Sequence, residues 1–141
     1  MLKTDVLTLW LRGQETIRAR VAATPPQHLA VTIITTEEIL GGWYTQIRQA
    51  RDDQVLARAY QALHGAIEFS RSIRILLFDL PEIRRYRQLR TQHRRIGTTD
   101  LRIAAIVLEQ QAILVTRNTR SCTCNERIIA ELAPGVVHLP A

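Results

Sequence analysis

Three carboxylates stand where helices are expected to begin, each close to a short apolar segment. Asp5 follows a very short expected strand at residues 1–4, Glu38 follows the branched segment 29–35, and Asp100 opens an apolar helix. Carboxylate oxygens are hard ligands, and a Mg²⁺ or Mn²⁺ ion offsets the repulsion between several of them held together. Such a metal activates water and stabilises displacement at phosphorus. The three acids therefore predict a phosphodiesterase site.

Two of these acids also have a simpler interpretation. Asp5 lies where a helix N-cap is expected, which the spacing favours over a ligand. Thr35 and Glu38 have capping-box spacing, so a helix is expected to start at Thr35, with Glu38 either completing the cap or serving as a ligand. The sequence leaves both alternatives open.

A fourth polar residue, Asn118, follows the apolar run 112–115. A run without polar alternation is typical of a strand that is buried on both faces of a parallel sheet. Ligands of α/β proteins bind beyond the carboxyl ends of such strands. We therefore expect Asn118 at the edge of the sheet where a site would form.

The elements that must position these residues alternate between strands and helices, which predicts an α/β fold: a three-layer α/β/α sandwich with a central parallel sheet. Residues 1–141 are expected to form one domain. The expected strands are a very short one at 1–4, then 29–35, 73–78 and 112–115, and an edge strand at 136–139. The expected helices lie in residues 5–11, 15–23, 35–50, 52–70, 81–95 and 100–108, with those at 35–50 and 52–70 forming a hairpin.

Residues 81–95 carry six arginines against a single acid, Glu82. Ile83, Tyr86 and Leu89 follow helical spacing and should point inward, so the arginines should face outward, where guanidinium groups bind phosphates and stack on bases. A solvated charged face is the alternative interpretation. The candidate RNA-binding residues are Arg84, Arg85, Arg87, Arg90, Arg94 and Arg95.

The composition supports a polyanionic partner, because the net charge is +6 and Lys3 is the only lysine. Cys122 and Cys124 stand one residue apart, too close for an ordinary structural disulfide and without the further ligands that a zinc site needs. No segment has the pattern of a signal peptide or a membrane span. We expect a soluble, cytoplasmic protein.

Several motifs resemble those of PIN-domain proteins of the VapC-type toxin group. Residues 2–7 resemble an opening L-D-T-D/N-V-L, and residues 35–43 resemble T-x-E-E-x-L-x-G-W. Residues 97–105 resemble G-T-x-D-L-R-I-A-A, and residues 114–122 resemble L-V-T-R-N-x-R-D-F. The resemblance extends from the start of the chain to about Arg120.

The resemblance implies a metal-dependent endoribonuclease that uses Mg²⁺ or Mn²⁺ and is held silent by a VapB-type antitoxin. It also implies a homodimer. Transferred to this chain, it assigns Glu38 and Asp100 to the catalytic metal site, with Asp5 as a weaker third acid. The residues that would shape the site are Lys3, Thr116, Asn118 and Ser121.

Two acidic positions of the family pattern are replaced in this chain. The first aspartate of the opening motif falls on Lys3, and the aspartate after the T-R-N motif falls on Ser121. Asp5 matches the second, polar position of the opening motif. We hypothesise that the Lys3 ammonium takes part of the place of the cation by pairing with Glu38 or Asp100.

Two functions follow from these departures. The first is an RNA-cleaving enzyme of the VapC type that uses Asp5, Glu38 and Asp100 with impaired activity. The second is a catalytically inactive protein that keeps the PIN fold and binds RNA or an antitoxin-like partner. The missing acids favour impaired catalysis, whereas the motifs favour a nuclease.

Overall fold

The computed structural model describes residues 2, 4–11, 13–116 and 136–138. Its helices are α1 (Thr4–Leu11), α2 (Glu15–Ala23), α3 (Ile33–Gln49), α4 (Asp53–Ser72), α5 (Leu80–Gln92) and α6 (Thr98–Glu109), with a short 3-10 turn at Pro26–His28. Its strands are β1 (Ala30–Thr32), β2 (Arg74–Leu76), β3 (Leu114–Thr116) and β4 (Val136–His138).

The strands form two parallel pairs that Leu2 joins. β1 pairs with β2, and β3 pairs with β4. The Leu2 N–H donates to the Ala30 carbonyl at 2.9 Å, and Leu2 forms a parallel bridge with Val115. The order across the sheet is therefore β2, β1, Leu2, β3, β4. Of the strand expected at residues 1–4, Leu2 lies in the sheet and Thr4 already belongs to α1.

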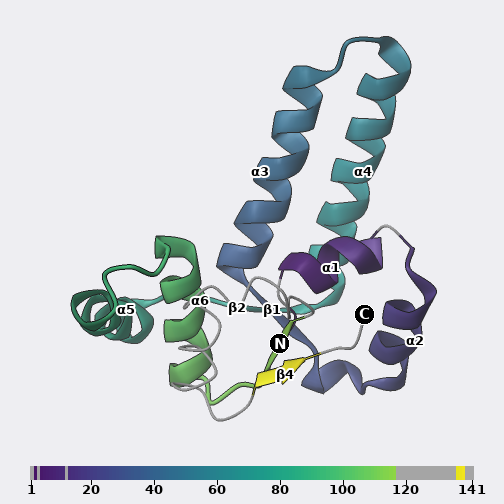
Figure 1. The fold of residues 1–141 in the computed structure, drawn as a ribbon. Helices are drawn as coiled ribbons and strands as arrows, with labels where there is room; N and C mark the ends of the chain where they lie inside the picture. Colours follow the sequence, from purple (N-terminus) through teal and green to yellow (C-terminus); the bar gives the residue numbers. More distant parts are fainter. Residues whose placement is uncertain (1, 3, 12, 117–135, 139–141) are drawn as a thin grey trace.

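Alternate strand residues point into two separate cores. Leu76 and Leu114 belong to a core built with α5 and α6, the α5–α6 core. Val31 belongs to a second core with α1 and α2, the α1–α2 core, against which Ile75 and Val115 pack. Because neighbouring strand residues face opposite sides, helices cover both faces of the sheet (Figure 1). The expected three-layer α/β/α arrangement is confirmed.

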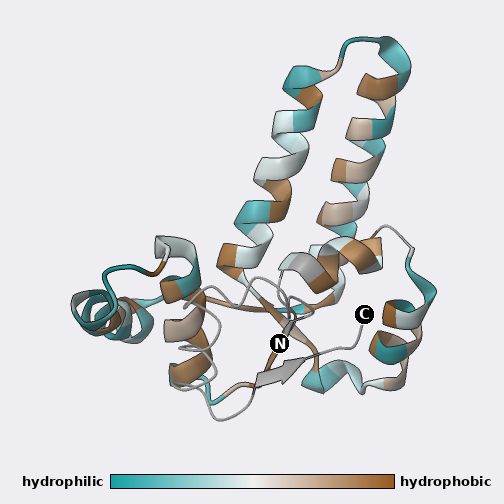
Figure 2. Ribbon diagram, viewed as in Figure 1, coloured by the Kyte–Doolittle hydropathy of each residue, from teal (hydrophilic) through white to brown (hydrophobic). Residues whose placement is uncertain are grey.

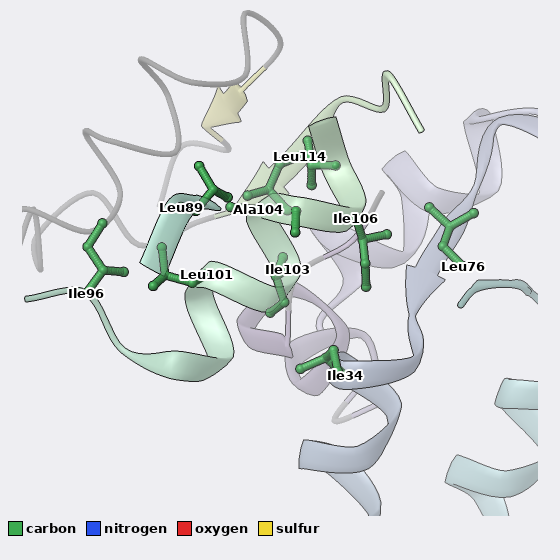
Figure 3. Close-up of a cluster of buried hydrophobic side chains, with 11 residues drawn as sticks. Ile34, Leu76, Leu89, Ile96, Leu101, Ile103, Ala104, Ile106 and Leu114 are labelled. Atoms are coloured by element: carbon green, nitrogen blue, oxygen red, sulfur yellow. The ribbon is translucent and has the colours of Figure 1, made fainter. Parts of the chain in front are cut away.

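Helix α6 lies at the centre of the α5–α6 core. Its residues from Leu101 to Val107, apart from Arg102, are each at most 1% exposed, and Figure 3 shows several of them converging with Ile34 and Leu114. The helix is buried nearly all round because α5, α3 and β3 surround it. The start of α6, where Asp100 stands, is therefore held by a fixed element.

The structure corrects several sequence-based boundaries and faces. The strand expected at 29–35 ends at Thr32, because α3 begins at Ile33. Ile113, expected inside a buried strand, precedes β3 and is 53% exposed. On α4 the buried face runs through Ala59, Leu63, Ala66 and Phe69, whereas Val55 and Ile67 are exposed.

The predicted helical hairpin of α3 and α4 is confirmed and extends away from the sheet (Figure 1). The parallel edge strand β4 is also found, at Val136–His138. The predicted helical turn at 128–132, and Cys122 and Cys124, lie outside the described residues. None of the helices within residues 4–116 that the structure describes has the length and apolar character needed to cross a bilayer.

The position of Leu2 predicts a large effect of its truncation. Leu2 is 4% exposed and packs in the α1–α2 core, so Leu2→Ala should lower the free energy of unfolding by about 3 kcal/mol through lost burial and a residual cavity. Urea denaturation followed by circular dichroism measures this change. Leu77→Ala is the matched control, because Leu77 is 54% exposed and its truncation should change stability by less than about 0.5 kcal/mol. Equal effects of the two substitutions would contradict the role of Leu2.

Candidate functional site

The carboxyl end of β1 turns directly into α3 through a threonine cap. Thr32 is the N-cap of α3, and its fully buried hydroxyl oxygen accepts a hydrogen bond from the Thr35 N–H at 3.0 Å. The predicted cap at Thr35 is therefore wrong by one helical turn, since the three-residue strand ends early and Thr32 captures the first free amide. This leaves Glu38 without a capping role.

Glu38 instead bonds across to the first helix. It is exposed on α3, and the Thr4 hydroxyl donates to its Oε2 at 2.5 Å. Thr4 is the first residue of α1, so this bond ties the beginning of one helix to the side of another. Holding one carboxylate oxygen this way fixes the orientation of the other, which is how a ligand carboxylate is positioned.

Asp100 is the third residue of α6 and is half-buried. Gly97 is the N-cap, and a Cβ atom added there would lie 3.5 Å from Asp100 Oδ2, so the carboxylate packs close to the cap backbone. The loop before the cap is anchored by Arg90, whose Nη1 donates to the Ile96 carbonyl at 3.0 Å. Asp100 is therefore held by α6 on one side and by an anchored loop on the other.

The strand directions place Glu38 and Asp100 at one edge of the sheet. Helix α3 leaves the carboxyl end of β1, whereas α6 ends in a tight turn in which the Ala112 N–H donates to the Val107 carbonyl at 3.0 Å before β3 starts. Helix α6 therefore runs opposite to the strands, and its first residues lie at their carboxyl ends. Ile34 of α3 packs beside Ile103 of α6 in the α5–α6 core (Figure 3).

The described residues supply only part of the predicted site. Asp5 lies in the first turn of α1, one residue past the start of the helix instead of at its N-cap, and the surroundings of its side chain lie outside the description. Among the described residues, no group of three or more His, Cys, Asp or Glu side chains could hold a metal ion. The predictions for Lys3, Asn118, Ser121 and the side chain of Thr116 also fall outside the described residues, so they stay predictions.

All six candidate arginines are exposed, as expected, but two of them make intramolecular contacts. Arg85 Nε donates to Glu109 Oε1 at 2.7 Å, and Arg90 donates to the carbonyls of Arg94 and Ile96. In the described part of the chain, no hydrogen bond or ion pair involves the side chains of the remaining four, which are Arg84, Arg87, Arg94 and Arg95. Most of the α5 ribbon has the colour of hydrophilic residues (Figure 2).

The single acid of this segment points away from the arginines. Glu82 is 3% exposed, accepts a hydrogen bond from the Asp79 N–H at 3.1 Å, and accepts another from Gln110 Nε2 at 2.9 Å. Burial by itself raises the pKa of Glu82. The hydrogen bonds from Gln110 and from the Glu82 and Asp79 backbone outweigh this effect, so the pKa lies below its ordinary value of 4.5. Glu82 therefore fixes the start of α5 and does not neutralise its exposed face.

The lowered pKa of Glu82 predicts a pH-dependent contribution to stability. Because the folded-state pKa is depressed, the contribution of the ionised carboxylate is complete above about pH 4.5 and is lost as the pH falls through the folded-state value. Glu82→Gln should lower the free energy of unfolding by about 1 kcal/mol at pH 7. The difference from the wild type should shrink below pH 4.5, as measured by urea unfolding at a series of pH values.

Glu37→Gln, on the exposed surface of α3, controls for the loss of one negative charge. A stability difference between the wild type and Glu82→Gln that stays constant from pH 7 to pH 3 would contradict the assigned role of Glu82.

Sequence reasoning missed the role of Thr4. The opening motif contains this threonine, but no periodicity or spacing rule connects a residue at position 4 with one at position 38. It also missed Thr32 as the cap, although a threonine at the end of a branched segment was a usable signal.

No family model matches the sequence, and no curated protein matches it significantly. Solved structures do match. FitAcB from Neisseria gonorrhoeae has a TM-score of 0.70 and 23% identity, covering 98% of this chain and 95% of the other. VapBC2 from Rickettsia felis, bound to a promoter DNA fragment, has a TM-score of 0.70 and 18% identity, covering 100% and 97%.

DNA-bound VapBC from Salmonella typhimurium has a TM-score of 0.69 and 21% identity, covering 99% of this chain and 96% of the matched chain. Identities this low concern the fold. The similarity of fold agrees with the sequence motifs, so the chain has the VapC-type PIN fold.

Proposed function

We propose that this protein is a metal-dependent endoribonuclease of the VapC toxin type, hydrolysing RNA phosphodiester bonds with reduced activity. The observation that carries the proposal is the position of Glu38 and Asp100, which a VapC-type PIN fold holds at the carboxyl edge of its sheet. The motifs around both residues resemble those of VapC-type nucleases.

The carboxylate oxygens of Glu38 and Asp100 are hard ligands, the type that Mg²⁺ and Mn²⁺ prefer. Glu38 and Asp100 would hold the ion, with Asp5 as the third acid. When bound, such a metal activates water and stabilises the charge that develops on phosphorus.

Neighbouring residues of the chain orient the two candidate ligand carboxylates. Thr4 holds Glu38 through one carboxylate oxygen, and the buried helix α6 with the Arg90-anchored loop holds Asp100. Lys3 in place of an aspartate changes the local charge by two units, and Ser121 in place of another removes one more negative charge. Both changes disfavour a divalent cation, which is why we propose reduced activity.

The exposed arginines of α5 and of the segment that follows it would bind the RNA backbone. Within the described part of the chain no hydrogen bond or ion pair involves the side chains of Arg84, Arg87, Arg94 and Arg95, and the net charge of +6 favours a polyanion. Arg85 and Arg90, which make intramolecular contacts, would contribute through their remaining donors.

A VapB-like antitoxin is the protein partner that we propose, because the similar folds occur in VapBC and FitAB toxin–antitoxin complexes. A homodimer is proposed on the resemblance alone, and a cytoplasmic location is proposed because the sparse cysteines suit a reducing compartment. The alternative function is a catalytically inactive PIN-fold protein that binds RNA or such a partner. The replacements at Lys3 and Ser121 favour this alternative.

Cleavage of a fluorescent single-stranded RNA with Mn²⁺ or Mg²⁺ tests the proposal. The wild type should cut slowly, Asp100→Asn should reduce cleavage to background, and the double reversion Lys3→Asp with Ser121→Asp should increase the rate by restoring two carboxylates. Arg58→Gln, which changes an exposed residue of α4, controls for a general change of charge.

Silence of both the wild type and the double reversion would reject the nuclease and leave the RNA-binding or antitoxin-binding alternative. Cleavage by the wild type that Asp100→Asn leaves unchanged would reject this site. Cleavage at the same rate before and after the reversion would reject the view that Lys3 and Ser121 limit activity.

The Thr4–Glu38 hydrogen bond predicts a role for Thr4 in activity. Thr4→Val keeps the shape of the side chain and removes the donor to Glu38, so cleavage should fall about 10-fold, as for the loss of partners that orient metal ligands. Thr4→Ser, which keeps the hydroxyl, should retain most of the activity. Equal rates for the valine and serine variants would show that the hydroxyl has no role.

A further inference from the structure

Arg102 of α6 lies over two aromatic rings. Its guanidinium carbon lies 5.9 Å from the centre of the Phe78 ring and 5.8 Å from the centre of the Tyr86 ring. The two rings meet edge to face, with centres 6.0 Å apart. Phe78 follows β2 and Tyr86 belongs to α5, so the three residues come together near the carboxyl edge of the sheet.

The hydrogen-bonding capacity of Arg102 is unused within the described residues. Its Nε is buried without an acceptor there, although the side chain as a whole is only half-buried. Of the nearby arginines, Arg85 pairs with Glu109 and Arg90 donates to two carbonyls, and those without such partners, such as Arg84 and Arg87, are exposed, whereas Arg102 is half-buried. An arginine with a purely structural role would be expected to find such an acceptor, because a buried donor left unpaired is destabilising.

We propose that Arg102 binds a phosphate group of the RNA backbone, with Phe78 and Tyr86 fixing the plane of its guanidinium. The inference rests on the proposed function, because it takes single-stranded RNA as the ligand. A guanidinium offers a planar fork of donors that matches two phosphate oxygens, and stacking on aromatic rings keeps that fork in one orientation. The phosphate would supply the acceptor that Nε lacks.

The position on α6 distinguishes this contact from the reaction itself. Residues two apart point to nearly opposite sides of a helix, so Arg102 reaches toward α5 while Asp100 points away from it. The phosphate at Arg102 is therefore a neighbouring one along the RNA and not the one being hydrolysed. Loss of Arg102 should raise KM and leave kcat nearly unchanged.

The test measures binding of a 2′-O-methyl oligoribonucleotide, which resists cleavage, by fluorescence anisotropy over a series of salt concentrations. Arg102→Met should weaken binding about 10-fold. It should also lower the slope of log K against log salt concentration by about 0.7, as expected for one lost phosphate contact on a single strand. Arg102→Lys should recover only part of the affinity, because an ammonium keeps the charge but not the fork.

Arg18→Met is the matched control. Arg18 lies 6.0 Å from the ring centre of Trp10, so its loss removes the same charge and the same kind of stacking contact near α1 and α2. This variant should leave affinity and salt slope close to those of the wild type. Equal losses for Arg102→Met and Arg18→Met would overturn the proposal.

A measurement on the wild-type protein covers the case in which Arg102→Met fails to fold. The NMR signal of the Arg102 Nε–H group should shift on titration with the same oligonucleotide, and an unchanged signal would overturn the inference. Cleavage of unmodified RNA, measured alongside binding, distinguishes the Arg102–phosphate contact from the proposed nuclease activity. Cleavage that does not depend on Arg102 rejects this contact alone, and a shifted Arg102 signal without cleavage rejects the nuclease alone.

Discussion

The fold depends on the backbone of one residue at the beginning of the chain. Leu2 donates to Ala30 in one strand pair and bridges Val115 in the other, so among the described residues its backbone joins the two parallel pairs into one sheet. The same segment continues into α1, whose first residue, Thr4, bonds to Glu38. A single short extended segment thus joins the sheet and orients one of the candidate site acids.

The two candidate acids at the sheet edge are supported in different ways. Asp100 belongs to α6, the most deeply buried helix, and α6 can hardly move because packing surrounds it. Glu38 is exposed on α3, so its direction depends on the hydrogen bond from Thr4. One half of the candidate site is therefore set by packing and the other by a polar contact.

The packing of α5 on α6 divides a uniform run of arginines into groups with different surroundings. Glu82 and Gln110, Arg85 and Glu109, and the stack around Arg102 all connect the two helices. Arg84 and Arg87, on the remaining surface of α5, are exposed and make no side-chain hydrogen bond or ion pair within the described part of the chain. The basic segment is therefore both a structural partner of α6 and a candidate surface for RNA.

The sequence determined the order of helices and strands, the α/β class and the candidate acids Glu38 and Asp100, because periodicity and motifs are local properties. It misplaced the start of α3, because the choice between Thr32 and Thr35 as the cap depends on where β1 stops pairing with β2. Only the tertiary structure decided that Thr4 holds Glu38 and that Arg102 lies over Phe78 and Tyr86. These contacts join residues far apart in the chain, and only folding brings such residues within hydrogen-bonding or stacking distance.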